Sequence, residues 1–293
     1  MNDTKYIQYS ILSKKPDVSE TLIGILSDFD FEGFEELENG CIAYIPESLA
    51  DCEKEWMPLI REMDEEIVIE KKVLEPKNWN EEWEKNYEIA HINDECEIYA
   101  SFHKVNPNIK YPLFIDPKMS FGTGHHPTTF MMCNFLFEYQ NNIKDKLVMD
   151  VGCGTGVLGI LAKKLGAKEI IAIDNDAICV ENTIENIQKN FSSDEWNKFT
   201  VIQADIQKYR ENFPKQKVDV LLANIQKNVI LSDYADYREI LNDKGWLFVS
   251  GILAEYKNEI IESFIGFDCI STKQKNEWMA FAFRKNEIKI SKL

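Results

Sequence analysis

Apolar and polar positions in the first part of the chain alternate between strand-like and helical spacing. Ile7, Tyr9 and Ile11 are separated by polar residues, which predicts a half-buried strand. Further on, apolar residues recur every three to four positions and predict a helix. Its apolar face comprises Leu22, Ile25, Leu26 and Phe29. Asn39-Gly40 then stands between two extended runs and predicts a hairpin.

A second amphipathic segment and a final strand complete this region. The apolar positions of the segment are Leu49, Cys52, Trp56, Leu59, Ile60 and Met63. Pro58 lies among them, so we expect a kink or a restart of the helix there. A strand then includes Ile67 and Ile69 and ends near Leu74. The order β-α-β-β-α-β predicts a ferredoxin-like α+β domain over residues 1–75, and because this region has no cofactor motif we expect it to recognise a substrate.

Residues 76–92 are predicted to form a linker helix. Trp79, Trp83 and Tyr87 follow one another at four-residue spacing in an otherwise polar segment. Such a stripe could cover the face of a domain, and an ordinary amphipathic surface helix has the same pattern. The remaining residues, 93–293, are long enough to form a second domain with its own core.

The second domain is organised around the stretch Leu147–Gly159, LVMDVGCGTGVLG. An apolar run ends at Asp150, glycines follow at alternate positions, and a helical pattern begins after them. A buried strand that leads into a glycine turn and a helix is the first unit of a doubly wound sheet. Gly154, Gly156 and Gly159 also satisfy the dinucleotide fingerprint, which is a weak signal by itself.

Two carboxylates favour S-adenosylmethionine over a dinucleotide as the ligand of this turn. Asp150 precedes the first glycine by two residues, where it would repel a pyrophosphate and would suit ammonium and sulfonium charges. Asp174 ends the next apolar strand, about 20 residues after the turn, where an acidic side chain meets ribose hydroxyls. We therefore interpret the turn as a site for S-adenosylmethionine.

Later apolar runs predict a parallel sheet that is completed by an antiparallel hairpin. Further strands are expected over residues 199–203, 218–223 and 245–250. No helical pattern separates residues 267–272 from residues 278–283, so these two strands must pair antiparallel. This arrangement is typical of class I methyltransferases, which are α/β proteins with a Rossmann-like doubly wound sheet.

The loop of residues 116–129, DPKMSFGTGHHPTT, carries a second candidate site. Pro127 suits the first turn of a helix, so one interpretation is a capped turn that leads into that helix. We favour a loop folded over the cofactor, with Phe121 as an apolar lid and Thr129 as a hydroxyl partner. His126 is expected to order this loop through a hydrogen bond.

Composition and charge exclude several classes of function. The net charge of −17 argues against a nucleic acid, including DNA, as the main partner. Residues 1–76 carry 7 Lys+Arg and 19 Asp+Glu, which could attract a basic partner or could serve solubility alone. Seven cysteines without a C-x-x-C pair, and histidines without a carboxylate at ligand spacing, predict no metal site. Because no signal peptide or apolar run of about 18 residues is visible, we expect a cytoplasmic enzyme without a membrane partner.

The motifs DPKMSFGTGHHPTT, DVGCGTG, IDNDA and LLANI resemble those of the PrmA family over the full chain. Members of that family use S-adenosylmethionine to methylate lysine ε-amines and the N-terminal α-amine of protein eleven of the large ribosomal subunit. They place a ferredoxin-like domain and a linker before the catalytic domain. The resemblance implies the same activity, cofactor and basic protein substrate here, in a monomeric enzyme. Matched by motif, the cofactor-binding positions are Thr129, Gly152, Asp174 and Asn224, with Phe121 and Gly154 as their neighbours.

Asn224 is expected to be the catalytic residue. Its side chain can accept an N–H of the neutral amine and orient the nitrogen lone pair toward the methyl group. Many members of the family have leucine where this chain has Gln226, and because Asn224 is retained we interpret the change as tuning of the site. Asp150 and Gly152 are expected at the methionine end of the cofactor. Asp205 is expected either at the adenine amino group or in a solvated turn.

Several other functions remain open at this point. A methyltransferase for glutamine or DNA adenine would carry Asn-Pro-Pro-Tyr or Asp-Pro-Pro-Tyr where this chain reads Asn224-Ile225-Gln226-Lys227. A nucleotide-dependent oxidoreductase is disfavoured by Asp150 and by the terminal hairpin. A ribosome-associated binding module with a decayed site is disfavoured by the intact glycines and acidic residues. A class I methyltransferase that acts on another protein or on a small amine is the remaining alternative.

Overall fold

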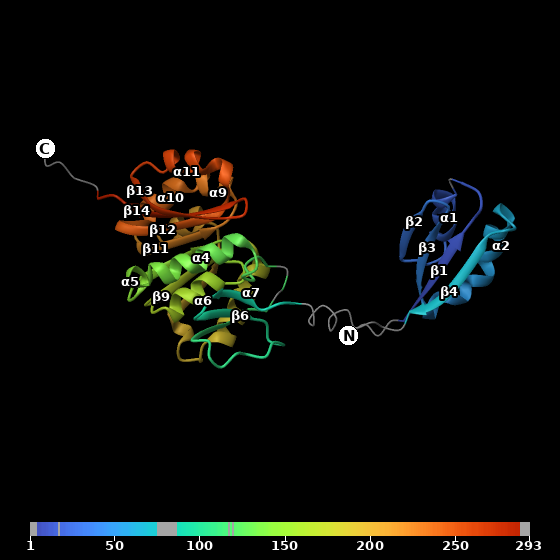
Figure 1. The fold of residues 1–293 in the computed structure, drawn as a ribbon, viewed down its shortest axis with the longest axis horizontal. Coiled ribbons are helices and arrows are strands. Elements are labelled where there is room, and N and C mark those ends of the chain that lie inside the picture. The colour runs from blue at the N-terminus through green and yellow to red at the C-terminus, as the bar shows by residue number, and fades with distance from the viewer. Residues whose placement is uncertain (1–4, 17, 75–86, 117, 119, 288–293) are drawn as a thin grey trace. The chain divides into compact units, whose positions relative to one another are not determined.

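The structure is a computed structural model that describes residues 5–16, 18–74, 87–116, 118 and 120–287. The chain divides into two compact units, Met1–Tyr87 and Glu88–Leu293 (Figure 1). Within the described ranges, every helix is too short or too polar to cross a lipid bilayer. Most of the linker helix predicted over residues 76–92 lies outside the described residues.

The first unit has the predicted order of elements. Its four strands are β1 (Tyr6–Leu12), β2 (Gly33–Leu37), β3 (Gly40–Pro46) and β4 (Val68–Leu74), and its two α-helices are α1 (Ser19–Leu26) and α2 (Glu53–Met63). The strands form an antiparallel sheet in the order β2-β3-β1-β4, which is the ferredoxin-like topology. Both helices cover the same face of this sheet, because the core combines inward side chains of β1 and β3 with those of α1 and α2.

The core of the first unit depends on three aromatic rings. Tyr9 projects from β1 toward Phe31 and Trp56, whose rings it meets edge-on with centroids 5.9 and 5.0 Å away. Trp56 and Ile60 are fully buried on either side of Pro58, and α2 continues through that proline without a restart. The predicted restart is therefore wrong: packing on both sides of Pro58 outweighs the one backbone hydrogen bond that a proline removes. The change of helix type comes earlier, where a 3-10 turn over Glu47–Cys52 precedes α2.

The predicted apolar face of this second segment also needs correction. Leu49 and Leu59 are each 44% exposed, so they do not belong to the core. Leu49 lies in the 3-10 turn, whose three-residue period rotates it away from the face that an α-helical period would give it. Trp56 and Ile60 carry the burial instead.

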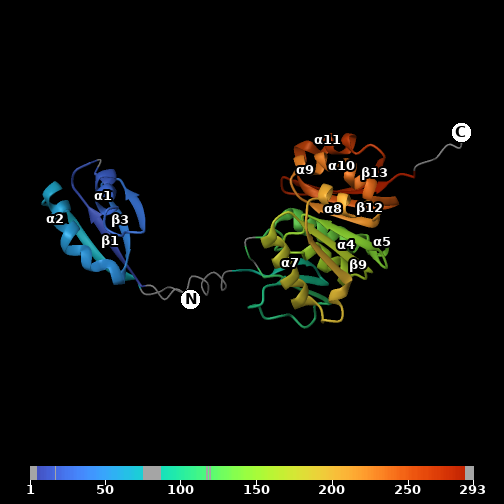
Figure 2. The ribbon, with the colours of Figure 1, turned by 180° about the vertical axis from the view of Figure 1, so that it is seen from behind.

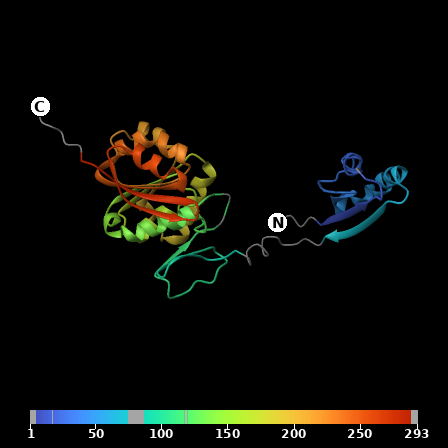
Figure 3. The ribbon, with the colours of Figure 1, turned by 45° about the horizontal axis from the view of Figure 1, so that its top comes forward.

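The second unit begins with a small sheet of β5 (Ala90–Asn93), β6 (Cys96–Tyr99) and β7 (Tyr111–Phe114). Strand β5 falls inside the segment predicted as linker, so the second unit starts before residue 93. Side chains of β5, β6 and β7 share a core cluster with α4 (Pro127–Glu138) and α6 (Val157–Lys164). Figure 3 shows this small sheet beside the helical layer.

The central sheet of the second unit has seven strands in the order β10-β9-β8-β11-β12-β14-β13. Their bounds are β8 (Leu147–Val151), β9 (Glu169–Asp174), β10 (Phe199–Gln203), β11 (Val218–Asn224), β12 (Leu241–Leu253), β13 (Phe267–Lys275) and β14 (Trp278–Lys285). The first five run parallel, and β14 pairs antiparallel with both β12 and β13, which confirms the predicted terminal hairpin. This is the sheet of a class I methyltransferase.

Helices cover both faces of the sheet. One apolar cluster packs α4, α6 and α7 (Ala177–Asn190) on one face. A second cluster packs four shorter helices on the other face, as the opposite views in Figures 1 and 2 show. These are α8 (Ile206–Asn212), α9 (Lys227–Ser232), α10 (Tyr234–Ile240) and α11 (Lys257–Ser263). A four-residue helix, α5 (Gln140–Ile143), follows α4 and contributes to the first cluster.

The strand order fixes where a ligand can enter. From β8 the chain proceeds outward through β9 and β10, and it then returns to the other side of β8 as β11 and continues to β12. The winding direction therefore reverses between β8 and β11. At such a switch point the loops that leave the two strands diverge and open a crevice at the carboxyl ends of the strands.

Candidate functional site

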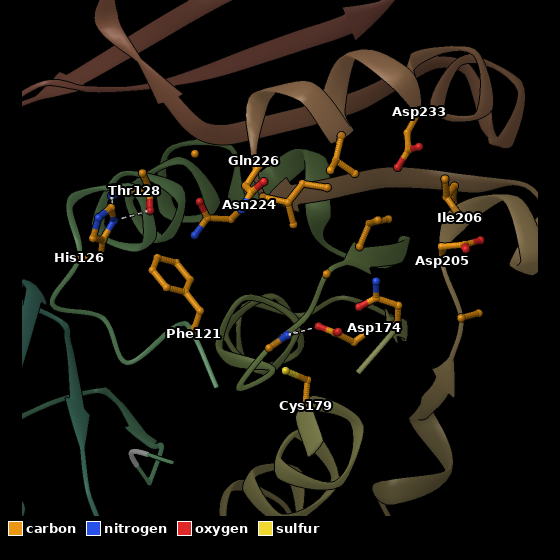
Figure 4. A pocket seen from close by; sticks show the side chains of 18 of the residues that line it. Phe121, His126, Thr128, Asp174, Cys179, Asp205, Ile206, Asn224, Gln226 and Asp233 are labelled. Atoms are coloured by element: carbon orange, nitrogen blue, oxygen red, sulfur yellow. Dashed lines mark hydrogen bonds between the residues drawn. The ribbon is translucent and has the colours of Figure 1, made fainter. Parts of the chain in front are cut away.

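A pocket of about 610 Å³ occupies this crevice (Figure 4). Its volume lies within the range of small-molecule and cofactor sites. Its lining comes from the ends of β8, β9, β10 and β11, from the loop before α4, and from β14. Phe121, His126 and Thr128 lie at one end, Asp174 lies in the middle, and Asp205, Ile206 and Asp233 lie at the other end.

The turn after β8 presents backbone rather than side chains to this pocket. Gly152 and Gly154 have positive φ angles of 66° and 55°. A Cβ on Gly152 would lie 2.3 Å from a side-chain carbon of Ile225, and one on Gly154 would lie 2.3 Å from the carbonyl oxygen of Phe121. Both residues line the pocket, so the glycines are required by conformation and by space together.

Asp174 connects this turn to the end of β9. Its Oδ2 accepts a hydrogen bond from the Gly154 N–H at 3.0 Å, and its Oδ1 accepts one from the Asp176 N–H at 3.0 Å. An ionised carboxylate offers about four acceptor sites, so two remain for a ligand. The side chain is buried against the pocket wall, where ligand hydroxyl groups would meet these free acceptor sites.

Asp150 has a different role from the predicted one. Its carboxylate is 1% exposed, is not part of the pocket lining, and accepts a hydrogen bond from the Gly159 N–H at 3.0 Å. It therefore joins β8 to α6 beneath the turn and does not face the pocket, where the sequence placed it. Burial raises the pKa of Asp150 to about 7, and the carboxylate of Asp174 acts in the same direction.

The loop of residues 120–129 is attached to the glycine turn. The carbonyl of Phe121 accepts a hydrogen bond from the Thr155 N–H at 3.0 Å, and the Thr155 hydroxyl donates to the carbonyl of Gly122 at 2.7 Å. These bonds hold the ring of Phe121, which is 52% exposed, in the pocket beside Asn224 (Figure 4). The loop is thus positioned over the pocket as expected.

The same loop is attached on its other side to the beginning of the second unit. A ring nitrogen of His125, Nε2, lies 2.9 Å from the carbonyl oxygen of Glu88. Gly124, with φ of 94°, leaves no room for a Cβ, which would lie 2.4 Å from Ile98 in β6. The loop therefore connects the glycine turn of the pocket with the residue at which the second unit begins.

His126 orders the end of this loop, as predicted. Its Nδ1 accepts a hydrogen bond from the Thr128 N–H and caps α4, and Pro127 occupies the first turn of that helix. Its ring lies edge-on to Phe121 at 5.1 Å and to Trp278 at 5.0 Å. Burial lowers the pKa of His126, so the ring is neutral at pH 7 and forms part of an aromatic wall. No group of three or more potential metal ligands occurs among the described residues.

Asn224 lies at the end of β11 and faces the pocket next to Phe121 (Figure 4). Its Nδ2 donates to the hydroxyl of Thr129 at 3.3 Å. Its Oδ1 is buried and has no hydrogen-bond partner among the described residues. Thr129 itself is buried behind Asn224 and is not part of the lining, whereas the neighbouring Thr128 is. A direct contact of Thr129 with the cofactor stays a prediction.

Asp205 and Cys153 each have an internal contact near the pocket. Asp205 caps α8 through its Oδ1, which accepts the Lys208 N–H at 2.7 Å, and it also lines the pocket. Both interpretations of Asp205 are therefore compatible with its position. Cys153 is buried with its sulfur 3.3 Å from the hydroxyl of Thr183, and burial raises its pKa. Burial thus disfavours a thiolate at this turn, and Cys153 is a small buried side chain that contacts Thr183.

Sequence reasoning missed several residues of the lining. Trp278 comes from β14, and Asp233 comes from the junction of α9 and α10. Both lie far along the chain from the glycine turn and belong to no motif, so only the folded sheet brings them to the pocket. The predicted positions Phe121, Gly152, Gly154, Asp174 and Asn224 do converge there.

The sheet order, the glycine turn after β8 and the carboxylate at the end of β9 define a class I methyltransferase. The family model described as Ribosomal protein L11 methyltransferase (PrmA) matches residues 35–286, and the chain belongs to this family. The predicted resemblance and fold class are thus confirmed.

Individual relatives agree with this assignment. The ribosomal protein L11 methyltransferase of Bacteroides thetaiotaomicron is 37% identical over 274 residues, which cover 91% of this chain and 94% of the relative. That of Porphyromonas gingivalis is 35% identical over 292 residues, which cover 95% and 97%. A crystal structure described as ribosomal protein L11 methylase from Lactobacillus delbrueckii subsp. bulgaricus superposes with a TM-score of 0.60 at 22% identity. It covers 69% of this chain and 100% of that chain, and supports the fold.

Proposed function

We propose that this protein transfers methyl groups from S-adenosylmethionine to amine nitrogens of ribosomal protein L11. We further propose that the acceptors are lysine ε-amines and the N-terminal α-amine. The observation that carries the proposal is the position of Asn224, whose amide has an unpartnered buried oxygen and lies at the pocket beside the glycine turn. A buried carbonyl oxygen without a partner is costly, so a ligand N–H is the expected partner.

The cofactor would lie along the length of the pocket. The backbone of Gly152 and Gly154 would receive its methionine end, Asp174 would accept ribose hydroxyls, and Asp205 would lie near its purine. The space that a Cβ would fill at both glycines and the two free acceptor sites of Asp174 support this fit. When bound, S-adenosylmethionine supplies a methyl group that is already activated by a sulfonium charge.

The acceptor amine would enter at the end formed by Phe121, His126 and Trp278. These rings make an uncharged wall that favours a neutral amine over an ammonium, because desolvation penalises the charged form. The unpartnered Oδ1 of Asn224 would accept an N–H of this amine. Asn224 then orients the nitrogen lone pair, while Thr129 holds the amide from behind.

We also propose that the first unit recognises the protein substrate. None of its described residues lines the pocket, and its sequence through residue 76 carries a net charge of −12. Carboxylates of Glu32 and Glu35 accept hydrogen bonds from Tyr6 and Tyr44, which hold negative charge beside exposed positions of the sheet. Such a surface would attract a basic protein and increase the rate of encounter.

Two measurements test the proposed function. Titration of the purified protein with S-adenosylmethionine and with NAD should show binding of the first and not of the second. Ribosomal protein L11 should then be incubated with the enzyme and S-adenosylmethionine and examined by mass spectrometry. Lysines and the N-terminus should gain mass in multiples of about 14 Da, because each transfer adds a net CH₂. Binding of the cofactor without methylation of L11 would place the activity on another amine.

A further inference from the structure

The pocket end opposite Phe121 holds a second carboxylate that no motif accounts for. Asp205 and Asp233 both line this end, together with the apolar side chain of Ile206 (Figure 4). Val229 is also part of the pocket lining. Asp205 follows β10, whereas Asp233 lies between α9 and α10. Two different segments of the chain therefore each bring an acceptor group to the same place.

Asp233 is 7% exposed and has weak internal partners. Its Oδ1 accepts the Ser232 hydroxyl at 3.1 Å, and its Oδ2 is 3.5 Å from the Tyr237 hydroxyl. It occupies the N-cap position of α10, yet its side chain makes no capping hydrogen bond. An aspartate at that position usually accepts a backbone N–H of the helix, and this one is directed toward the pocket instead.

Two nearby carboxylates need a donor between them. Burial raises the pKa of Asp233, and the negative charges of Asp236 and Asp205 act in the same direction. Arg210 is engaged with Asp236 and does not neutralise the pocket. A ligand group with two N–H donors and no formal charge would satisfy both carboxylates at an apolar slot. The exocyclic amino group of an adenine ring has this chemistry.

We propose that Asp233 accepts a hydrogen bond from the 6-amino group of the cofactor adenine, beside Asp205, and thereby selects adenine over 6-oxo purines. This inference rests on the proposed function, because it places S-adenosylmethionine in the pocket. A 6-oxo purine would direct a carbonyl oxygen at two acceptors. A site that is built to hydrogen-bond an N–H rejects an analogue that lacks it far more strongly than an apolar slot can.

Calorimetry on the full chain with S-adenosylhomocysteine and S-inosylhomocysteine tests this. The wild-type protein should prefer the adenine compound by more than about 200-fold, which is the most that an apolar slot alone supplies. Asp233→Asn should weaken binding of the adenine compound by about tenfold and should narrow the preference, because the asparagine amide can donate to the 6-oxo group. A folded Asp233→Asn variant with the wild-type preference would overturn the proposal.

Two control variants separate recognition from local structure. Tyr237→Phe removes the hydroxyl that contacts Asp233 without altering the lining, and Asp236→Asn removes a neighbouring charge outside the pocket. Both should keep the wild-type preference between the two compounds. Loss of the preference in either control to the same extent as in Asp233→Asn would mean that Asp233 acts only through the local fold.

A measurement on the wild-type protein covers the case in which Asp233→Asn does not fold. The N6-methyl derivative of S-adenosylhomocysteine keeps one N–H, so it can satisfy only one of the two carboxylates. It should bind about tenfold more weakly than the parent compound. Equal affinity for the two compounds would refute the proposal that Asp233 accepts a second hydrogen bond beside Asp205. Failure of the wild-type protein to bind S-adenosylhomocysteine at all would instead refute the proposed function.

Discussion

The side-chain amide of Asn224 donates to the hydroxyl of Thr129 at 3.3 Å and so joins the end of β11 to the first turn of α4. The two residues are 95 positions apart in the chain. The proposed acceptor site therefore depends on the folded sheet and on the loop over the pocket together.

Asn224→Ala should lower the rate of methylation strongly while S-adenosylmethionine affinity stays within a few-fold. Orientation of the amine acts mainly in the transition state, so its loss appears in kcat. Single-turnover kinetics with L11 and calorimetry with the cofactor measure the two quantities. Thr129→Val is the matched control for the supporting contact and should have the smaller effect. A loss of cofactor binding with a normal single-turnover rate would reverse the assigned role.

Asp174→Ala should weaken cofactor binding by about 1–3 kcal/mol, because ligand hydroxyls and the Gly154 N–H lose their acceptor. Asp176→Ala is a suitable control, since Asp176 caps α7 through Ile178 and does not line the pocket. Calorimetry on both folded variants decides the matter. Equal affinity of Asp174→Ala and wild type would make Asp174 a purely structural strand-end residue.

Asp150→Asn should change how stability depends on pH. The pKa of Asp150 is about 7 in the folded protein and near 3.9 in an unfolded chain, so between these values the folded state binds a proton that the unfolded state has lost. The contribution of Asp150 to the free energy of unfolding therefore falls as pH rises from about 4 to about 7. Asparagine still accepts the Gly159 N–H but does not titrate. Between pH 5 and pH 8, the free energy of unfolding of the variant, measured in urea, should rise relative to that of the wild type by about 2–4 kcal/mol. If the two proteins show the same dependence of this free energy on pH, the prediction is contradicted.

Trp278→Leu should raise the KM for the protein substrate and leave cofactor affinity nearly unchanged. The tryptophan ring lies edge-on to His126 at the end of the pocket where the amine is expected to enter. Trp196→Leu is a matched control on the surface, away from the pocket lining. Steady-state kinetics with L11 compare the two variants. If cofactor affinity falls and KM does not, Trp278 belongs to the cofactor end instead.

Removal of residues 1–87 should preserve cofactor binding and abolish or greatly weaken methylation of L11. The second unit has its own core, and every described residue that lines the pocket belongs to it. For the intact enzyme, association with L11 should slow as added salt shortens the Debye length toward about 8 Å and below. Stopped-flow association and methylation assays measure both effects. A truncated enzyme that methylates L11 at the intact rate would refute the recognition role of the first unit.

Much of the fold and part of the site follow from local patterns. The glycines at 152 and 154 and the carboxylate of Asp174 are placed by the strand and turn that contain them, so the sequence predicts them well. Asp150 shows the limit: the pattern locates the end of β8, but whether a side chain faces the pocket or the helix beneath depends on backbone twist. Asp233 and Trp278 reach the pocket only through the sheet order. Pro58 remains inside α2 because tertiary burial of Trp56 and Ile60 outweighs a local penalty.

The hydrogen bond between His125 and the carbonyl of Glu88 ties the loop over the pocket to the residue at which the second unit begins. On its other side the loop is bonded to Thr155 in the glycine turn. A pull on the chain at residue 88 and a ligand beneath Phe121 therefore act on the same short segment. Free-energy coupling between two sites is reciprocal. If a bound ligand stabilises the position of residue 88 by a given free energy, then displacing residue 88 weakens ligand binding by that same free energy.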